Sequence, residues 1–254
     1  MLYGLYLSAQ GAQARSTQLD VVANNLANAG TTAFKRDLAL FQAHRPFDLE
    51  HGGSNLAPGG LVGSTGGLTV AETVTDFSQG ALEKTGGSLD LAIAGPGFFR
   101  VTDGTEELLT RDGRFARNAA GELVTAGGRR VLSVEGTPIR LNPDAIAVEV
   151  APDGTLSERF PTGELSAAAR LAVVLPQPPD AVEKVGDNLY RAAGGVVPVG
   201  ADTRVAQGFL EGSGVNPVTE TMRMIEASRA FETNVNMMKF QDESLARLLT
   251  AARP

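Results

Sequence analysis

Apolar residues recur at alternating spacings of three and four along the first 26 residues of the chain. This stripe consists of Leu2, Leu5, Ala9, Ala12, Ser16, Leu19, Ala23 and Leu26, with Ser16 as its one polar member. A heptad stripe is typical of a helix that packs lengthwise against another helix. We therefore predict a helix of about 39 Å at 1.5 Å per residue. Asn28 and Gly30 both tolerate left-handed backbone and supply its stop.

The C-terminal segment repeats the pattern. Asn216 suits the position that caps a helix, and Pro217 suits the first helical turn. The same alternation then runs through Thr221, Met224, Ser228, Phe231, Val235, Met238, Asp242, Leu245 and Leu249. Two stripes this far apart in the chain have no nearby element to cover them, so we predict that the two helices pair with each other and then with other copies.

The middle of the chain has a different residue pattern, in which short apolar runs alternate with turn residues. The runs cover residues 89–93, 98–101, 122–125, 145–150 and 171–175. Asp103-Gly104, Asp112-Gly113 and Asp153-Gly154 are hairpin signals, because both residue types accept the backbone of tight turns. The predicted fold class is α+β: N- and C-terminal helices paired in a coiled-coil-like core, with a central, mainly antiparallel β domain.

Glycine sets the predicted boundaries. The chain has 254 residues and 30 glycines, of which three lie in residues 1–43 and none in residues 216–254. Glycine is costly in helices and useful in turns. We expect an N-terminal helical segment at 1–43, a Gly-rich mobile connection at 44–67, a central β domain at 68–215 and the C-terminal helix at 216–254.

Charge and composition exclude several classes of protein. The net charge of −7 consists of −8 in the middle of the chain and +1 in residues 1–43, and an acidic middle argues against nucleic acid, since phosphates require basic patches. No apolar run approaches the roughly 20 residues of a membrane span. The absence of cysteine excludes disulfides. A cleaved secretory signal is disfavoured because the first basic residue, Arg15, follows the apolar start.

Candidate catalytic and metal-binding chemistry is absent from the sequence. The two histidines, His44 and His51, lie in the Gly-rich connection, which offers no rigid support for a site. No glycine loop has the Gly-Lys-Ser/Thr ending of a phosphate-binding loop, and Arg100 replaces the third glycine of a dinucleotide fingerprint. We therefore predict no catalytic, cofactor-binding or metal site and no enzymatic activity.

A subunit interface is the functional site that the sequence predicts. Asn24, Asn25 and Asn28 cluster near the end of the first helix, and an amide that donates and accepts at once suits a hydrogen-bonded contact with a neighbouring chain or loop. The predicted interface residues are Leu2, Leu5, Leu19, Asn24, Asn25, Leu26, Asn28, Met224, Phe231, Val235, Met238 and Leu245.

Five separated segments resemble the axial proteins of the bacterial flagellum, specifically the rod proteins of the basal body. They are LDVVANNLAN (19–28) with TTAFK (31–35), DLAIAGPGFF (90–99) with TRDG (110–113), GDNLY (186–190), QGFLEGS (207–213), and VNPV (215–218) running to MIEASRAFE (224–232). Ala33 stands where the family usually has glycine, which implies a changed turn. Leu109 and Gly214 replace the usual tyrosine and asparagine.

The resemblance implies export of the unfolded chain through the flagellar type III apparatus and helical polymerisation. The terminal helices would line a hollow shaft in the periplasm, with other rod and hook subunits as partners. The length favours a proximal or distal rod subunit, with a slight preference for the proximal one. Two alternatives remain open: an exported β-domain adhesin with a helical stalk, and an enzyme that acts on cell-wall glycan through surface carboxylates.

Overall fold

The chain forms two compact units. The computed structural model describes residues 2–44, 67–178, 182–200 and 202–251, without the side chains of Leu2, Tyr3 and His44. Unit 1 consists of Met1–Ala29, Arg36–Asp76 and Val215–Pro254, and unit 2 of Gly30–Lys35 and Phe77–Gly214. The predicted connection at 44–67, with His51, lies outside the described residues apart from its two ends.

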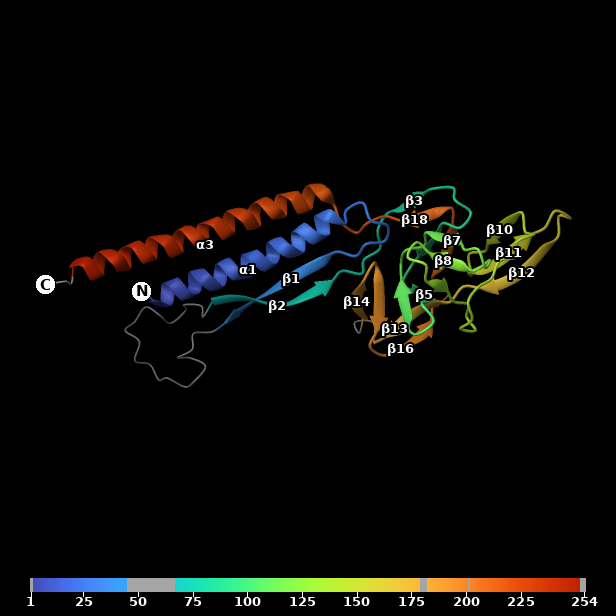
Figure 1. Cartoon of the computed structure of the whole chain (residues 1–254), viewed down its shortest axis with the longest axis horizontal. Helices are drawn as coiled ribbons and strands as arrows, with labels where there is room; N and C mark the ends of the chain where they lie inside the picture. Colours follow the sequence, from blue (N-terminus) through green and yellow to red (C-terminus); the bar gives the residue numbers. More distant parts are fainter. Residues whose placement is uncertain (1, 45–66, 179–181, 201, 252–254) are drawn as a thin grey trace. The chain divides into compact units, whose positions relative to one another are not determined.

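Unit 1 contains the two predicted helices and a pair of strands. Helices α1 (Leu2–Ala27) and α3 (Pro217–Ala251) run antiparallel, and α1 lies between α3 and the ribbon formed by β1 (Asp37–His44) and β2 (Gly67–Thr75) (Figure 1). Both helices were predicted, whereas the ribbon was not. β1 lies in the segment assigned to the helices, and β2 in the segment assigned to the β domain.

The contact between α1 and α3 follows a different stripe from the one predicted. Gly4 lies against Gln241 and Gly11 against Asn234, so facing residue numbers add to 245 in both pairs. The predicted positions Ala9, Ser16 and Ala23 are exposed instead. Small glycines opposite long amides allow a close approach of the two helices, and a search for apolar residues alone misses such a stripe.

The helix ends agree with the sequence in position but only partly in mechanism. The Asn216 side-chain oxygen accepts the backbone N–H groups of Val218 and Thr219 at 3.1 and 3.2 Å, which confirms the predicted cap. α1 ends at Ala27 without a left-handed residue at Asn28 or Gly30. The N–H of Asn28 instead bonds back to carbonyls within the last turn.

Unit 2 is built from antiparallel strands, as predicted. Its strands are β3 (Leu82–Lys84), β4 (Leu91–Ala94), β5 (Phe98–Thr102), β6 (Glu107–Thr110), β7 (Phe115–Arg117), β8 (Leu123–Thr125), β9 (Arg130–Val131), β10 (Ala147–Val150), β11 (Thr155–Arg159), β12 (Leu165–Arg170), β13 (Val173–Gln177), β14 (Val182–Gly186), β15 (Leu189–Ala192), β16 (Gly195–Pro198), β17 (Arg204–Gln207) and β18 (Phe209–Glu211). The largest sheet has the order β14-β15-β6-β5-β9-β8-β7, and β13 pairs with both β5 and β16. Smaller sheets pair β10-β11-β12, β17-β4 and β18-β3.

Two of the three Asp-Gly signals mark hairpins. Gly104 and Gly154 have φ angles of 104° and 85° and connect β5 to β6 and β10 to β11. The prediction at Asp112-Gly113 is wrong, because β6 and β7 are not neighbours in the sheet. Gly113 is required by space: a Cβ there would lie 1.6 Å from the carbonyl oxygen of Leu91.

The core of unit 2 is apolar and divided into two clusters. The larger cluster surrounds Phe99, Leu123 and Leu156, all fully buried. The smaller one joins Phe98 to Tyr190, whose ring centroids lie 5.5 Å apart. Unit 2 therefore has the interior of an independently folded domain.

Candidate subunit interface

The predicted interface residues in unit 1 differ widely in exposure. Asn24 is exposed and Asn25 is buried, while the remaining members are half-buried: Leu5, Leu19, Leu26, Asn28, Met224, Phe231, Val235, Met238 and Leu245. The side chain of Leu2 lies outside the description. On each helix the half-buried apolar residues therefore retain surface that the chain itself does not cover.

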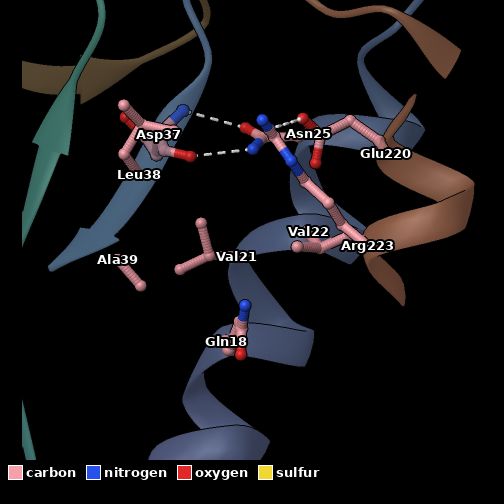
Figure 2. A pocket seen from close by; sticks show the side chains of 9 residues that line it. All are labelled: Gln18, Val21, Val22, Asn25, Asp37, Leu38, Ala39, Glu220 and Arg223. Atoms are coloured by element: carbon pink, nitrogen blue, oxygen red, sulfur yellow. Dashed lines mark hydrogen bonds and ion pairs between the residues drawn. The ribbon is translucent and has the colours of Figure 1, made fainter. Parts of the chain in front are cut away.

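Asn25 uses its amide within its own chain. Its Nδ2 donates to the carbonyl of Asp37 at 2.8 Å, and its Oδ1 accepts the N–H of Asp37 at 2.9 Å. The side chain thus pairs with the first residue of β1 as a neighbouring strand would (Figure 2). The amide is thus occupied by a strand of its own chain, and this contact fixes the start of β1 on α1. Asn28 donates to the carbonyl of Asn24 at 2.9 Å.

Helix α3 carries most of the uncovered apolar surface. Its only buried residues are Glu220 and Ala227. Large apolar side chains on it are exposed to between 48% and 71%, namely Val218, Met222, Ile225, Met237, Phe240, Leu248 and Leu249. Exposed large apolar side chains in this number on one helix are typical of an interaction site. The predicted interface residues of α3 are half-buried, and none of this more exposed set is among them, because residues spaced three and four apart occur on several faces of the helix.

A small pocket lies where α1, β1 and the start of α3 meet. Its walls are Gln18, Val21, Val22, Asn25, Asp37, Leu38, Ala39, Glu220 and Arg223 (Figure 2). Its volume is about 100 Å³, equivalent to a few water molecules or one side chain. The pocket brings Asn25, a predicted interface residue, together with charged residues that the sequence analysis did not select.

Glu220 is the buried charge of this pocket. Its side chain is 2% exposed, and its Oε1 accepts from Nη1 of Arg223 at 2.6 Å. Its Oε2 has no hydrogen-bond partner among the described residues. A buried carboxylate oxygen without a donor is costly, so the site favours a group that brings one.

Unit 2 contains a second buried charge cluster that the sequence analysis also missed. Nζ of Lys35 lies 2.5 Å from Oε1 of Glu211, with both side chains at most 1% exposed. Nζ also donates to the carbonyl of Ser78 at 2.7 Å, and the N–H of Gly80 donates to Glu211 at 2.8 Å. Arg111 lies 3.4 Å from Oε2 of the same carboxylate. One carboxylate therefore holds four segments of the unit together.

The surroundings of Arg111 perturb its ionisation. Burial lowers the pKa of its guanidinium, while the nearby Glu211 and Tyr190 act in the opposite direction. The guanidinium also stacks 5.4 Å from the centre of the Phe98 ring, a favourable arrangement for a cation. Lys35 and Glu211 both lie in segments that resemble the flagellar rod proteins, TTAFK and QGFLEGS. They are 176 residues apart in the chain, and no pattern in the sequence indicates that they pair.

Three family models match successive parts of the chain. Residues 5–35 match the flagella basal body rod protein model, residues 92–158 the flagellar hook protein FlgE/F/G D1 domain, and residues 206–251 the flagellar basal body rod FlgEFG protein C-terminal model. The flagellar basal-body rod protein FlgF of Caulobacter vibrioides is 38% identical over 92% of this chain and 91% of its own length. The chain belongs to the flagellar basal-body rod protein family.

Other relatives of this rod protein are named FlgG rather than FlgF. The flagellar basal-body rod protein FlgG of Bacillus subtilis is 31% identical over the full length of both chains, and that of Buchnera aphidicola from Schizaphis graminum is 33% identical over 98% of this chain and 99% of its own. The similarity thus covers both units of the rod protein. No helix in its described part is long and apolar enough to cross a membrane.

Proposed function

We propose that this chain is a structural subunit of the bacterial flagellar basal-body rod and polymerises through its terminal helices into the shaft. The observation that carries the proposal is the surface of α3, a 35-residue helix with two buried residues and seven exposed large apolar ones. A helix of this kind is stabilised by packing that one copy does not supply. Family membership supports an assembly with other flagellar subunits, in which such packing would form.

The same proposal covers location and partners. The relatives are named as basal-body rod proteins, which supports a place in the rod, in contact with other rod and hook subunits. Export through the flagellar type III apparatus is part of the proposal, because an axial subunit has to reach the growing end of the shaft. The role is mechanical, with torque carried by many helix contacts in parallel.

Deletion of residues 1–26 tests the proposal in motile cells. We expect loss of rods in electron micrographs of basal bodies, while unit 2 of the purified variant keeps its β-sheet circular dichroism. Leu19→Glu and Phe231→Glu should likewise abolish motility, because they place charge on half-buried interface positions.

Val134→Glu serves as the matched control. Val134 is exposed in unit 2, so the same charge should leave motility intact. Rods built by the deletion variant would refute the role of the helices. Intact flagella in cells lacking the whole protein would favour the alternative of an exported adhesin.

A further inference from the structure

Helix α3 extends past the start of α1 in unit 1. In the register set by Gly4 with Gln241 and Gly11 with Asn234, Leu2 faces residue 243. Residues 244–251 of α3 therefore have no α1 residue opposite them, and we name them the overhang. Leu248, seven residues after Gln241, continues the α1-facing stripe and is 48% exposed. The overhang thus presents an α1-facing surface without α1.

The overhang also carries an exposed cation, one turn after Glu243. Arg247 is exposed and makes no ion pair with any residue that the structure describes. Leu249 beside it is 71% exposed. One turn of helix therefore carries a guanidinium and, on its next two positions, two leucines.

The pocket at the opposite end of unit 1 has the complementary chemistry. Its charged residues are Glu220, Arg223 and Asp37, and one carboxylate remains in excess after the pair between Glu220 and Arg223. Asp37 already accepts the hydroxyl of Thr75 at 2.7 Å, whereas Oε2 of Glu220 has no partner in the described chain. The apolar residues of the pocket wall are Val21, Val22, Leu38 and Ala39. The site therefore combines an unpartnered carboxylate oxygen with neighbouring apolar surface.

We infer that the overhang of one copy docks at this pocket of a second copy, with Arg247 donating to Glu220 and the leucines covering the apolar surface beside it. This inference rests on the proposed polymerisation and names its contact. The occupant comes from another chain, because the 27 residues between Glu220 and Arg247 span about 40 Å of rigid helix. Arginine suits the site, since its guanidinium can donate two hydrogen bonds at once.

This contact uses two different surfaces, so each docked copy keeps one free pocket or one free overhang. Such a heterologous contact that does not close on itself produces an open filament. A contact between two identical surfaces would instead stop at a dimer. The two arrangements differ in which residues become neighbours, and cross-linking distinguishes them.

Cysteine cross-linking tests the contact directly, because the chain has no cysteine of its own. Ala39→Cys marks the pocket wall and Leu248→Cys marks the overhang. We expect disulfide-linked dimers when the two variants are mixed under oxidising conditions and none from either variant alone. Thr233→Cys, at an exposed site midway along α3, is the control and should not link to Ala39→Cys. Links in Leu248→Cys alone, or none in the mixture, would overturn the inference.

Blocked ends give a second test by light scattering of the purified full chain. Arg247→Glu removes the overhang's cation, and Ala39→Arg places a cation in the pocket. Each variant alone should associate at least tenfold more weakly than the wild type, and their mixture should stop at a one-to-one complex. Lys239→Glu makes the same charge change on an exposed site before the overhang and should associate normally. Circular dichroism checks that each variant folds. If Ala39→Arg does not fold, cross-linking of Ala39→Cys to Leu248→Cys still tests the docking.

Polymerisation and docking of the overhang are contradicted by different results. A wild-type chain that stays monomeric at every concentration would contradict the proposed polymerisation. If the wild type associates and Arg247→Glu associates equally well, only the docking of the overhang is contradicted.

Discussion

Replacing Lys35 by methionine should lower the free energy of unfolding of unit 2 by about 3–5 kcal/mol, the usual cost of removing one partner of a buried ion pair. The Lys35 and Glu211 side chains are 1% and 0% exposed, so water does not replace the lost ammonium. The variant also leaves the carbonyl of Ser78 without that donor. Glu211 keeps the N–H of Gly80 and the more distant Arg111, which do not restore a partner at 2.5 Å.

The neighbouring residue provides a matched comparison. Arg36 pairs with Asp76 in unit 1, and these side chains are 31% and 21% exposed. Partly exposed pairs contribute about 0–1 kcal/mol, so Arg36→Met should cost far less than Lys35→Met. Urea unfolding at neutral pH, followed by circular dichroism in the β-sheet region, measures both variants. Domains of this size have a total stability of about 5–15 kcal/mol, which leaves Lys35→Met measurable but marginal.

The double variant Lys35→Met/Glu211→Gln separates the pair from its surroundings. Glutamine keeps an acceptor for the N–H of Gly80 and removes the unpaired charge, so the double variant should be less destabilised than the sum of the two single variants. A loss for Lys35→Met no larger than that for Arg36→Met would refute the view that this buried pair stabilises unit 2.

Three further changes have definite expected results. Ala33→Gly should stabilise unit 2 by up to about 1 kcal/mol in thermal unfolding. Ala33 has a φ of 56°, and left-handed backbone costs alanine about 1–2 kcal/mol, a cost partly offset by the greater flexibility of glycine in the unfolded chain. A loss of stability would contradict this prediction. Gly113→Ala should destabilise by about 1–3 kcal/mol in the same assay, since the new Cβ would overlap a carbonyl oxygen. The N–H and hydroxyl of Thr155 hold the pKa of Asp153 below its ordinary 3.8, so its stabilising contribution is present above that pH and lost as pH falls through the lowered value. Asp153→Asn should remove this acid dependence, and an NMR titration midpoint at or above 3.8 for Asp153 would contradict it.

The sequence predicted those elements whose signals are local. The cap at Asn216 and the apolar runs of the β domain each depend on residues close together in the chain. The two glycine-poor ends contain the helices α1 and α3, although the N-terminal one also contains most of β1. Ala33 is more informative: the substitution was expected to change the turn, yet its backbone has the left-handed φ that glycine adopts most readily.

What the sequence could not predict depends on distant partners. β1 is half of a ribbon whose other strand begins at Gly67, and without that partner its residues were assigned to the N-terminal helical segment at 1–43. The contact between α1 and α3 uses Gly4 and Gly11, which an apolar pattern does not include. The pairing of Lys35 with Glu211 joins two ends of the chain, and neither residue has a sequence feature that names the other.

The two units reach their stability in different ways, and this difference follows from their interiors. Unit 2 buries leucine, isoleucine and phenylalanine in a continuous cluster. The helix contact in unit 1 instead places glycines against Gln241 and Asn234, and α3 buries only an alanine and a glutamate. Since burial of apolar area is the main stabilising contribution, a single copy gains little from pairing its helices. In the polymer proposed above, neighbouring copies that cover the exposed residues of α3 would add that contribution, and ordering of the helices would then accompany assembly of the shaft.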